Sequence, residues 1–238
     1  MRLLSRVLGG LLALLVVTGP ASARVAVAAF ALWGDQGVFR SEATGAAAVI
    51  AARYGAVRTV IRANSPARAL AGPAAFTAAL AEAGRGLDPA SDVLVVILTS
   101  HGIPDGVAVK GGRVEGTLPP RALGALLARS PVVHKVVVVS ACFSGIFTTL
   151  ANPDTLVITA VDAGHPSFGC EAGAKWTYFG RAFFDQALRD AVGSRADLAA
   201  VFGHAADLVR VREAEQGFEP SNPQMAGGAD VLRLLDGS

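Results

Sequence analysis

Two reactive side chains each stand at the end of a long apolar run. Cys142 follows four consecutive valines and Ser140-Ala141, and His101 directly follows the apolar segment Asp92–Ser100. An imidazole beside a thiol stabilises the thiolate and can later protonate a leaving amine. The backbone N–H groups of Gly102 and Cys142 are suited to bind an oxyanion between them. The alternative is structural: Cys142 would be a small packed residue, and His101 would cap a strand by hydrogen bonding.

The apolar runs predict the elements that position these residues. They are continuous, which is typical of strands buried on both faces, and they alternate with helix-forming segments. This order predicts an α/β fold with a doubly wound, mainly parallel sheet. Tips of neighbouring parallel strands meet at one sheet edge about 4.8 Å apart, so His101 and Cys142 can approach each other. The predicted strands are Arg24–Leu32, Val57–Arg62, Asp92–Ser100, His134–Ala141 and Thr155–Val161, and the predicted helices are Arg40–Tyr54, Pro73–Gly84, Pro119–Arg129, Trp176–Ala191 and Asp197–Glu215.

Three shorter segments complete the predicted topology. Gly111-Gly112 separates two short extended segments and is typical of a tight hairpin turn. The segment Ile146–Ala151 can form a helix after Cys142. The chain after the last predicted helix carries Pro220 and Pro223, which predicts an extended tail.

The N-terminus has the pattern of a signal peptide. Two arginines precede the apolar segment Leu11–Thr18, and Ala21-Ser22-Ala23 fits the small-residue cleavage rule. This predicts a signal peptide over residues 1–23 and one domain over residues 24–238. The apolar segment is shorter than the roughly 20 residues of a membrane span, so no stable membrane insertion is expected after cleavage. The predicted location is periplasmic or secreted.

The composition excludes several other classes of function. Hydrophobic residues make up 52% of the 238 residues, enough for a substantial core, and the net charge is only +2. We expect no nucleic-acid partner, because no basic block with interleaved aromatic residues is present. We also expect no metal and no cofactor, because the sequence has no His-Glu-x-x-His, Cys-x-x-Cys or phosphate-binding glycine pattern. The oligomeric state is left open.

The chain has only two cysteines, Cys142 and Cys170. Export would place them in a compartment where a disulfide can persist. A disulfide between them would prevent Cys142 from acting as a nucleophile. The sequence leaves both the free and the paired state open.

The reactive residues lie in motifs that resemble those of the legumain-like cysteine peptidases, peptidase family C13, which are relatives of the caspases. An apolar strand leads into Ser100-His101-Gly102, and a second one into Ser140-Ala141-Cys142 followed by Ser144-Gly145. The resemblance continues through Thr177-Tyr178-Phe179-Gly180 and covers the chain after the predicted signal peptide.

This resemblance implies a caspase-like three-layer sandwich, with a mainly parallel central sheet flanked by helices. It implies an endopeptidase in which His101 is the general base and acid and Cys142 the nucleophile. The Gly102 and Cys142 amides would form the oxyanion hole. The substrate would be a peptide or protein, cleaved through an acyl-enzyme. A relative transfers the acyl group to an amine, so a transpeptidase or ligase side activity is also implied.

The residues expected to bind substrate depart from the legumain pattern. Arg40 resembles the arginine that helps line the legumain pocket for the residue before the scissile bond. The acidic partners of that arginine fall at positions held here by Phe143 and Arg181. We therefore hypothesise a basic pocket that favours an acidic residue or tolerates many residues. Ser167 and Phe168 correspond to the edge that binds the substrate strand.

Two other functions are compatible with parts of the sequence. The segment Ser140–Ser144 loosely resembles the nucleophile elbow of α/β-hydrolases, in which Cys142 would act with Asp162 and His204. That reading leaves His101 without a role. The second alternative is an exported binding domain that keeps the fold without catalysis.

Overall fold

The structure is a computed structural model, and it describes residues 22–171, 173–192 and 195–236. The predicted signal peptide therefore lies outside the described residues, except for Ser22 and Ala23. Within the described ranges, no helix is both long and apolar enough to cross a membrane.

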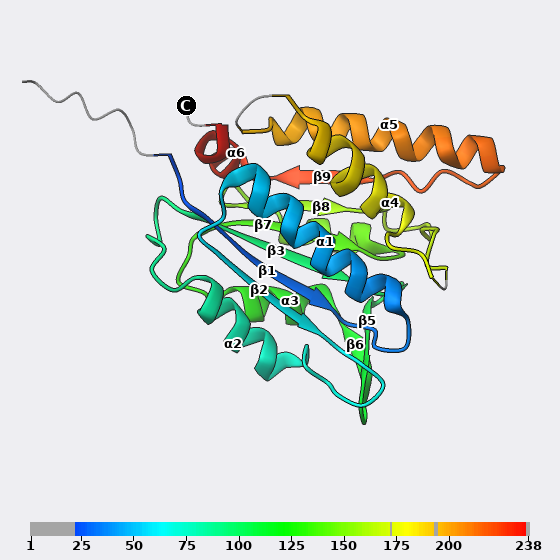
Figure 1. Cartoon of the computed structure of the whole chain (residues 1–238), viewed down its shortest axis with the longest axis horizontal. Coiled ribbons are helices and arrows are strands. Elements are labelled where there is room, and N and C mark those ends of the chain that lie inside the picture. The colour runs from blue at the N-terminus through cyan, green and yellow to red at the C-terminus, as the bar shows by residue number, and fades with distance from the viewer. Residues whose placement is uncertain (1–21, 172, 193–194, 237–238) are drawn as a thin grey trace, which may run out of the picture.

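A six-stranded sheet with the order β2-β1-β3-β7-β8-β9 forms the centre of the molecule (Figure 1). The first five strands are parallel, and β9 pairs antiparallel with β8 at one edge. The mainly parallel α/β sheet predicted from the apolar runs is thus confirmed. The strands are β1 (Val25–Ala31), β2 (Arg58–Ala63), β3 (Val93–Thr99), β7 (His134–Ser140), β8 (Thr155–Thr159) and β9 (Gln224–Gly227).

Helices cover both faces of the sheet, which makes three layers. Alternate residues of β1 enter different cores: Val25 and Val27 pack with α1, and Ala26 and Ala28 pack with α2 and α3. Figure 1 shows α1 crossing the front of the sheet near α4 and α5. Burial on both sides explains why these strands carry continuous apolar runs. The helices are α1 (Gly37–Tyr54), α2 (Pro73–Ala83), α3 (Pro120–Leu127), α4 (Tyr178–Gly180), which continues as the π-helical segment Arg181–Leu188, α5 (Leu198–Gln216) and α6 (Ala229–Asp236).

A second, three-stranded sheet leaves the C-terminal tip of β3. It consists of β4 (Gly102–Ile103), β5 (Gly106–Gly111) and β6 (Val114–Leu118). The predicted hairpin is present, but its turn lies one residue later than expected. Gly111 still pairs with Val114, and Gly112 has the positive φ of 55° that the turn requires.

The C-terminal segment differs from the predicted extended tail. It forms β9 and α6, so the sheet gains an antiparallel edge strand. The four residues of β9 are Gln-Met-Ala-Gly, which have little strand propensity of their own. Pairing with β8 sets their conformation. The segment after Cys142 is also tighter than an α-helix: Ser144–Leu150 forms a 3₁₀ helix.

Candidate active site

The register of β3 and β7 brings His101 and Cys142 to the same edge of the sheet. Thr99 pairs with Ser140, and the Ser100 amide donates to the Ser140 carbonyl at 3.2 Å. His101 and Cys142 each lie two residues beyond that last pair. Because neighbouring strands are about 4.8 Å apart, the two side chains leave adjacent points of the sheet edge.

Two aromatic rings hold the imidazole of His101. The Trp33 ring centroid lies 5.2 Å and the Phe39 centroid 4.9 Å from the His101 ring, both in edge-on geometry. Burial in this apolar setting lowers the pKa of His101 below its ordinary value of 6.5. The imidazole is therefore neutral at neutral pH, which is the form that can accept a proton from a thiol.

A sharp backbone turn presents Cys142. The next residue, Phe143, adopts the left-handed conformation with φ 54°, and the 3₁₀ helix begins directly after it. Non-glycine residues rarely adopt this conformation, so the turn is a strained point that its surroundings must hold. The Cys142 Sγ lies 3.3 Å from the Ser167 amide, which donates to it, and 3.5 Å from the Ser167 carbonyl oxygen.

The backbone of Gly102 packs directly on Cys142. A Cβ at Gly102 would lie 1.8 Å from the Cys142 carbonyl oxygen, so only glycine fits at this position. Gly102 faces Val107 across the β4–β5 pair, and the Ala108 amide donates to the His101 carbonyl at 2.9 Å. This pattern makes Gly102 and Val107 a non-hydrogen-bonded pair, so β5 leaves the Gly102 N–H unused.

Sequence reasoning missed Glu42, a fully buried carboxyl group on α1 beneath the two strand tips. Its oxygens accept hydrogen bonds from the Thr99 hydroxyl at 2.9 Å and the Thr177 amide at 2.7 Å. Burial raises the pKa of Glu42, while hydrogen bonds from Ser140, Thr177 and Thr99 oppose that change. Glu42 thereby joins α1, both strand tips and the start of α4. The sequence does hold a signal for the burial of Glu42: it lies three residues after Phe39, so both fall on the apolar face of α1.

The four residues predicted to bind substrate lie around this edge. Arg40 is on the first turn of α1, where its Nη2 donates to the Asn64 carbonyl at 3.4 Å. Phe143 and Ser167 flank Cys142, as described above. The Phe168 ring stacks on Phe218 with centroids 4.2 Å apart.

A cavity of about 640 Å³ opens beside Gly169, between α1, α4 and α5. It carries four basic side chains against two acidic ones, so its charge is net positive. Arg212 lies over the Tyr178 ring at 3.8 Å, and Arg189 pairs with Asp185 at 2.9 Å. The cavity is lined by Ser41, Gly45, Gly169, Glu171, Ala174, Lys175, Trp176, Tyr178, Arg181, Asp185, Arg189 and Arg212. The lining includes Arg181 and Ser41 but not Arg40.

Both cysteines are free thiols in the structure. Burial, with smaller contributions from Cys142 and Glu42, raises the pKa of Cys170 to about 12. A thiol with such a pKa is almost fully protonated at neutral pH and is a poor nucleophile. Of the two cysteines, Cys142 is therefore the better candidate.

The structure does not assemble the triad of the α/β-hydrolase alternative. The Asp162 carboxylate contacts His165 Nδ1 at 2.8 Å. His204 lies on α5 and lines a separate cavity with Gln186 and Asp190. No group of three or more His, Cys, Asp or Glu side chains able to hold a metal ion occurs in the described part of the chain.

Comparisons with known proteins agree with this architecture. The structure is similar to the crystal structure of caspase-1 from Spodoptera frugiperda, with 13% sequence identity, a TM-score of 0.61 and 87% of each chain covered. It is also similar to the structure of pro-sf-caspase-1, with 12% identity, a TM-score of 0.59, and 86% of this chain and 91% of that chain covered. At such identities the likeness shows the fold alone. A search of curated protein sequences gave no match.

The family model described as "Peptidase C13 family" matches residues 77–228, which is more than half of the chain and includes both strand tips. The predicted resemblance is thereby confirmed. The chain belongs to the peptidase C13 family, and it is a cysteine peptidase with a caspase-like fold that hydrolyses peptide bonds.

Proposed function

We propose that Cys142 and His101 form the catalytic dyad of this peptidase. The observation that carries the proposal is the strand register, which places both residues two positions beyond the paired Thr99 and Ser140. The lowered pKa of His101 supports it, because a neutral imidazole can take the thiol proton. The Gly102 N–H, which β5 leaves unused, supports its assignment to the oxyanion hole.

The proposed reaction proceeds in two halves. His101 removes the proton from the Cys142 thiol, and the thiolate attacks the carbonyl carbon of the scissile peptide bond. The Gly102 and Cys142 amides stabilise the oxyanion that forms. The C–N bond then breaks, the amine leaves with the proton held by His101, and a thioester remains on Cys142. In the second half, His101 takes a proton from water, which attacks the thioester and releases the new carboxyl group and the free thiol.

An amine can replace water in the second half and form a new peptide bond. We propose this transpeptidase activity as a side reaction of the same thioester. We also propose that the protein is exported, on the strength of the N-terminal sequence pattern.

We further propose that the basic cavity receives an acidic residue of the substrate. A peptide library varied at the position before the scissile bond is expected to favour Asp or Glu, because Arg181 and Lys175 attract a carboxylate. Arg181→Glu is expected to lower kcat/KM for the acidic peptide about tenfold, close to 1.4 kcal/mol. Arg113→Glu is the control, because Arg113 is exposed in the β5–β6 turn. A sharp preference for asparagine in the wild type would contradict the proposal.

A further inference from the structure

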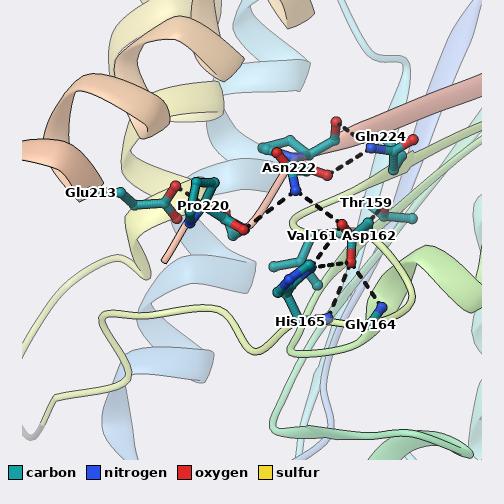
Figure 2. Close-up of polar contacts among 11 residues, drawn as sticks. Thr159, Val161, Asp162, Gly164, His165, Glu213, Pro220, Asn222 and Gln224 are labelled. Carbon is teal, nitrogen blue, oxygen red and sulfur yellow. Dashed lines mark hydrogen bonds and ion pairs between the residues drawn. The ribbon is translucent and has the colours of Figure 1, made fainter. Parts of the chain in front are cut away.

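The loop after β8 winds around one carboxylate (Figure 2). Asp162 Oδ1 accepts hydrogen bonds from the Gly164 amide at 2.8 Å, the His165 amide at 3.1 Å and His165 Nδ1 at 2.8 Å. Asp162 Oδ2 accepts from His165 Nδ1 at 2.8 Å and from Asn222 Nδ2 at 3.1 Å. Figure 2 shows the His165 ring and the Asn222 amide meeting this carboxylate from two different segments. One side chain therefore fixes the course of the loop.

The segment before β9 is hydrogen-bonded both to Asp162 and to α5. The Asp162 amide donates to the Ser221 carbonyl at 2.9 Å, and the Ser221 amide donates to Glu213 Oε2 at 3.1 Å. Asn222 itself has a positive φ of 53°, which asparagine tolerates better than most residues. The Asp162 loop is thus connected through Ser221 and Asn222 to α5 and to the edge strand.

The same loop contacts the turn at Cys142 in three places. The Phe143 amide donates to the His165 carbonyl at 3.0 Å, and the Gly145 amide donates to the Asp162 carbonyl at 3.3 Å. The Ser167 amide donates to the Cys142 Sγ at 3.3 Å. A Cβ at Gly145 would lie 2.3 Å from the Asp162 carbonyl carbon, so the two backbones are in close contact.

These contacts meet the turn where its backbone is strained. Phe143 holds a left-handed φ of 54°, and such a conformation persists only where surrounding contacts fix it. The loop organised by Asp162 supplies contacts on either side of Phe143. A change in the loop would therefore move the Cys142 sulfur relative to His101.

We propose that Asp162 and His165 are positioning residues for the reaction at Cys142: their hydrogen bond shapes the loop that holds the nucleophile turn. The inference rests on the proposed role of Cys142. His165 acts here through its Nδ1–H and its backbone, while its ring is 45% exposed beside Asp162, which is 27% exposed. Burial alone would raise the pKa of Asp162, but hydrogen bonds from Asn222, His165 and Gly164 and the charge of His165 lower it. The carboxylate is therefore ionised at neutral pH.

The test compares two substitutions of the same histidine. Asparagine carries an N–H at the place of Nδ1 in histidine, but it has no counterpart of Nε2. His165→Ala is expected to lower kcat about 10²-fold with little change in KM, because misplacement of a reacting group by about 1 Å has an effect of this size. His165→Asn is expected to keep kcat within about threefold of the wild type. The rate of Cys142 alkylation by iodoacetamide is expected to fall in His165→Ala and to recover in His165→Asn.

A second Asp–His pair provides the matched control. His134 Nδ1 lies 3.4 Å from Asp154 at the opposite end of β7, so His134→Ala removes a similar contact far along the strand from Cys142. It is expected to leave kcat and the alkylation rate unchanged.

Three results would overturn the positioning role. The first is a wild-type kcat in His165→Ala, and the second is an equal loss in His165→Asn and His165→Ala, which would point to chemistry at Nε2. The third is an equal loss in the His134→Ala control. Peptidase activity that survives in Cys142→Ala would instead overturn the proposed function itself, so the two failures are distinguishable.

Discussion

Gly102→Ala is expected to lower kcat for peptide hydrolysis by about 10²- to 10³-fold, the size of the loss of one oxyanion donor. The added methyl group would lie 1.8 Å from the Cys142 carbonyl oxygen and 2.9 Å from the Cys142 nitrogen. Backbone at that distance cannot yield by rotating a side chain, so the tip of β4 must move away from Cys142. The two amides proposed to bind the oxyanion would then no longer converge. Steady-state kinetics measures this loss.

The control for Gly102→Ala lies in the same small sheet. A methyl group at Gly116, on β6, would meet no heavy atom of the described residues within 4 Å. Gly116→Ala is expected to keep wild-type kcat. Thermal melting of both variants separates an effect on the site from an effect on stability, since overpacking by itself costs about 1–3 kcal/mol. Full activity in a folded Gly102→Ala enzyme would exclude Gly102 from the oxyanion hole.

His101→Ala is expected to lower kcat/KM by about 10³-fold, because general acid–base catalysis contributes about 10²–10⁴-fold. His101 is half-buried between Trp33 and Phe39, and its removal leaves the thiol without a base. Comparing peptide hydrolysis by the variant and the wild type measures the effect.

His204→Ala is the matched control for His101→Ala. His204 lies on α5 in a separate cavity, so its removal is expected to leave kcat/KM unchanged. The opposite pattern, an inactive His204→Ala and an active His101→Ala, would favour the α/β-hydrolase arrangement and contradict the dyad.

The sequence was sufficient to predict the fold and the meeting of the two strand tips. Strands buried on both faces require continuous apolar runs, and parallel pairing brings their C-terminal tips to one edge. His101 and Cys142 could be placed there because each directly follows such a run. The caspase-like sandwich was confirmed by the structural neighbours, and the peptidase family by the family match.

The contacts that support the site could not be read from the sequence. Glu42 accepts a hydrogen bond from Thr177, which is 135 residues away in the sequence. Asp162 accepts one from Asn222, which is 60 residues away. No local pattern encodes such pairs, because they arise only when the tips of several strands converge. The edge strand β9 was missed for the same reason, since pairing with β8 rather than propensity makes it a strand.

The basic character of the cavity between α1, α4 and α5 was only partly visible in the sequence. Arg181 stands at a position that is acidic in the legumain pattern, and it lines this cavity. Lys175, Arg189 and Arg212 were not anticipated, because they reach the cavity from three separate segments. The net charge of a pocket depends on this assembly and not on any single substitution.

The proposed dyad is tested most directly by locating the residue on which the enzyme forms its covalent bond. The wild type and Cys142→Ala should be treated with a peptide acyloxymethyl ketone, and the intact mass of each protein measured. We expect one probe adduct on the wild type, located at Cys142 by peptide mapping, and none on Cys142→Ala. Cys170 stays unlabelled in both, because burial raises the pKa of its thiol to about 12. Labelling that persists in Cys142→Ala would remove Cys142 from the mechanism and contradict the proposed dyad.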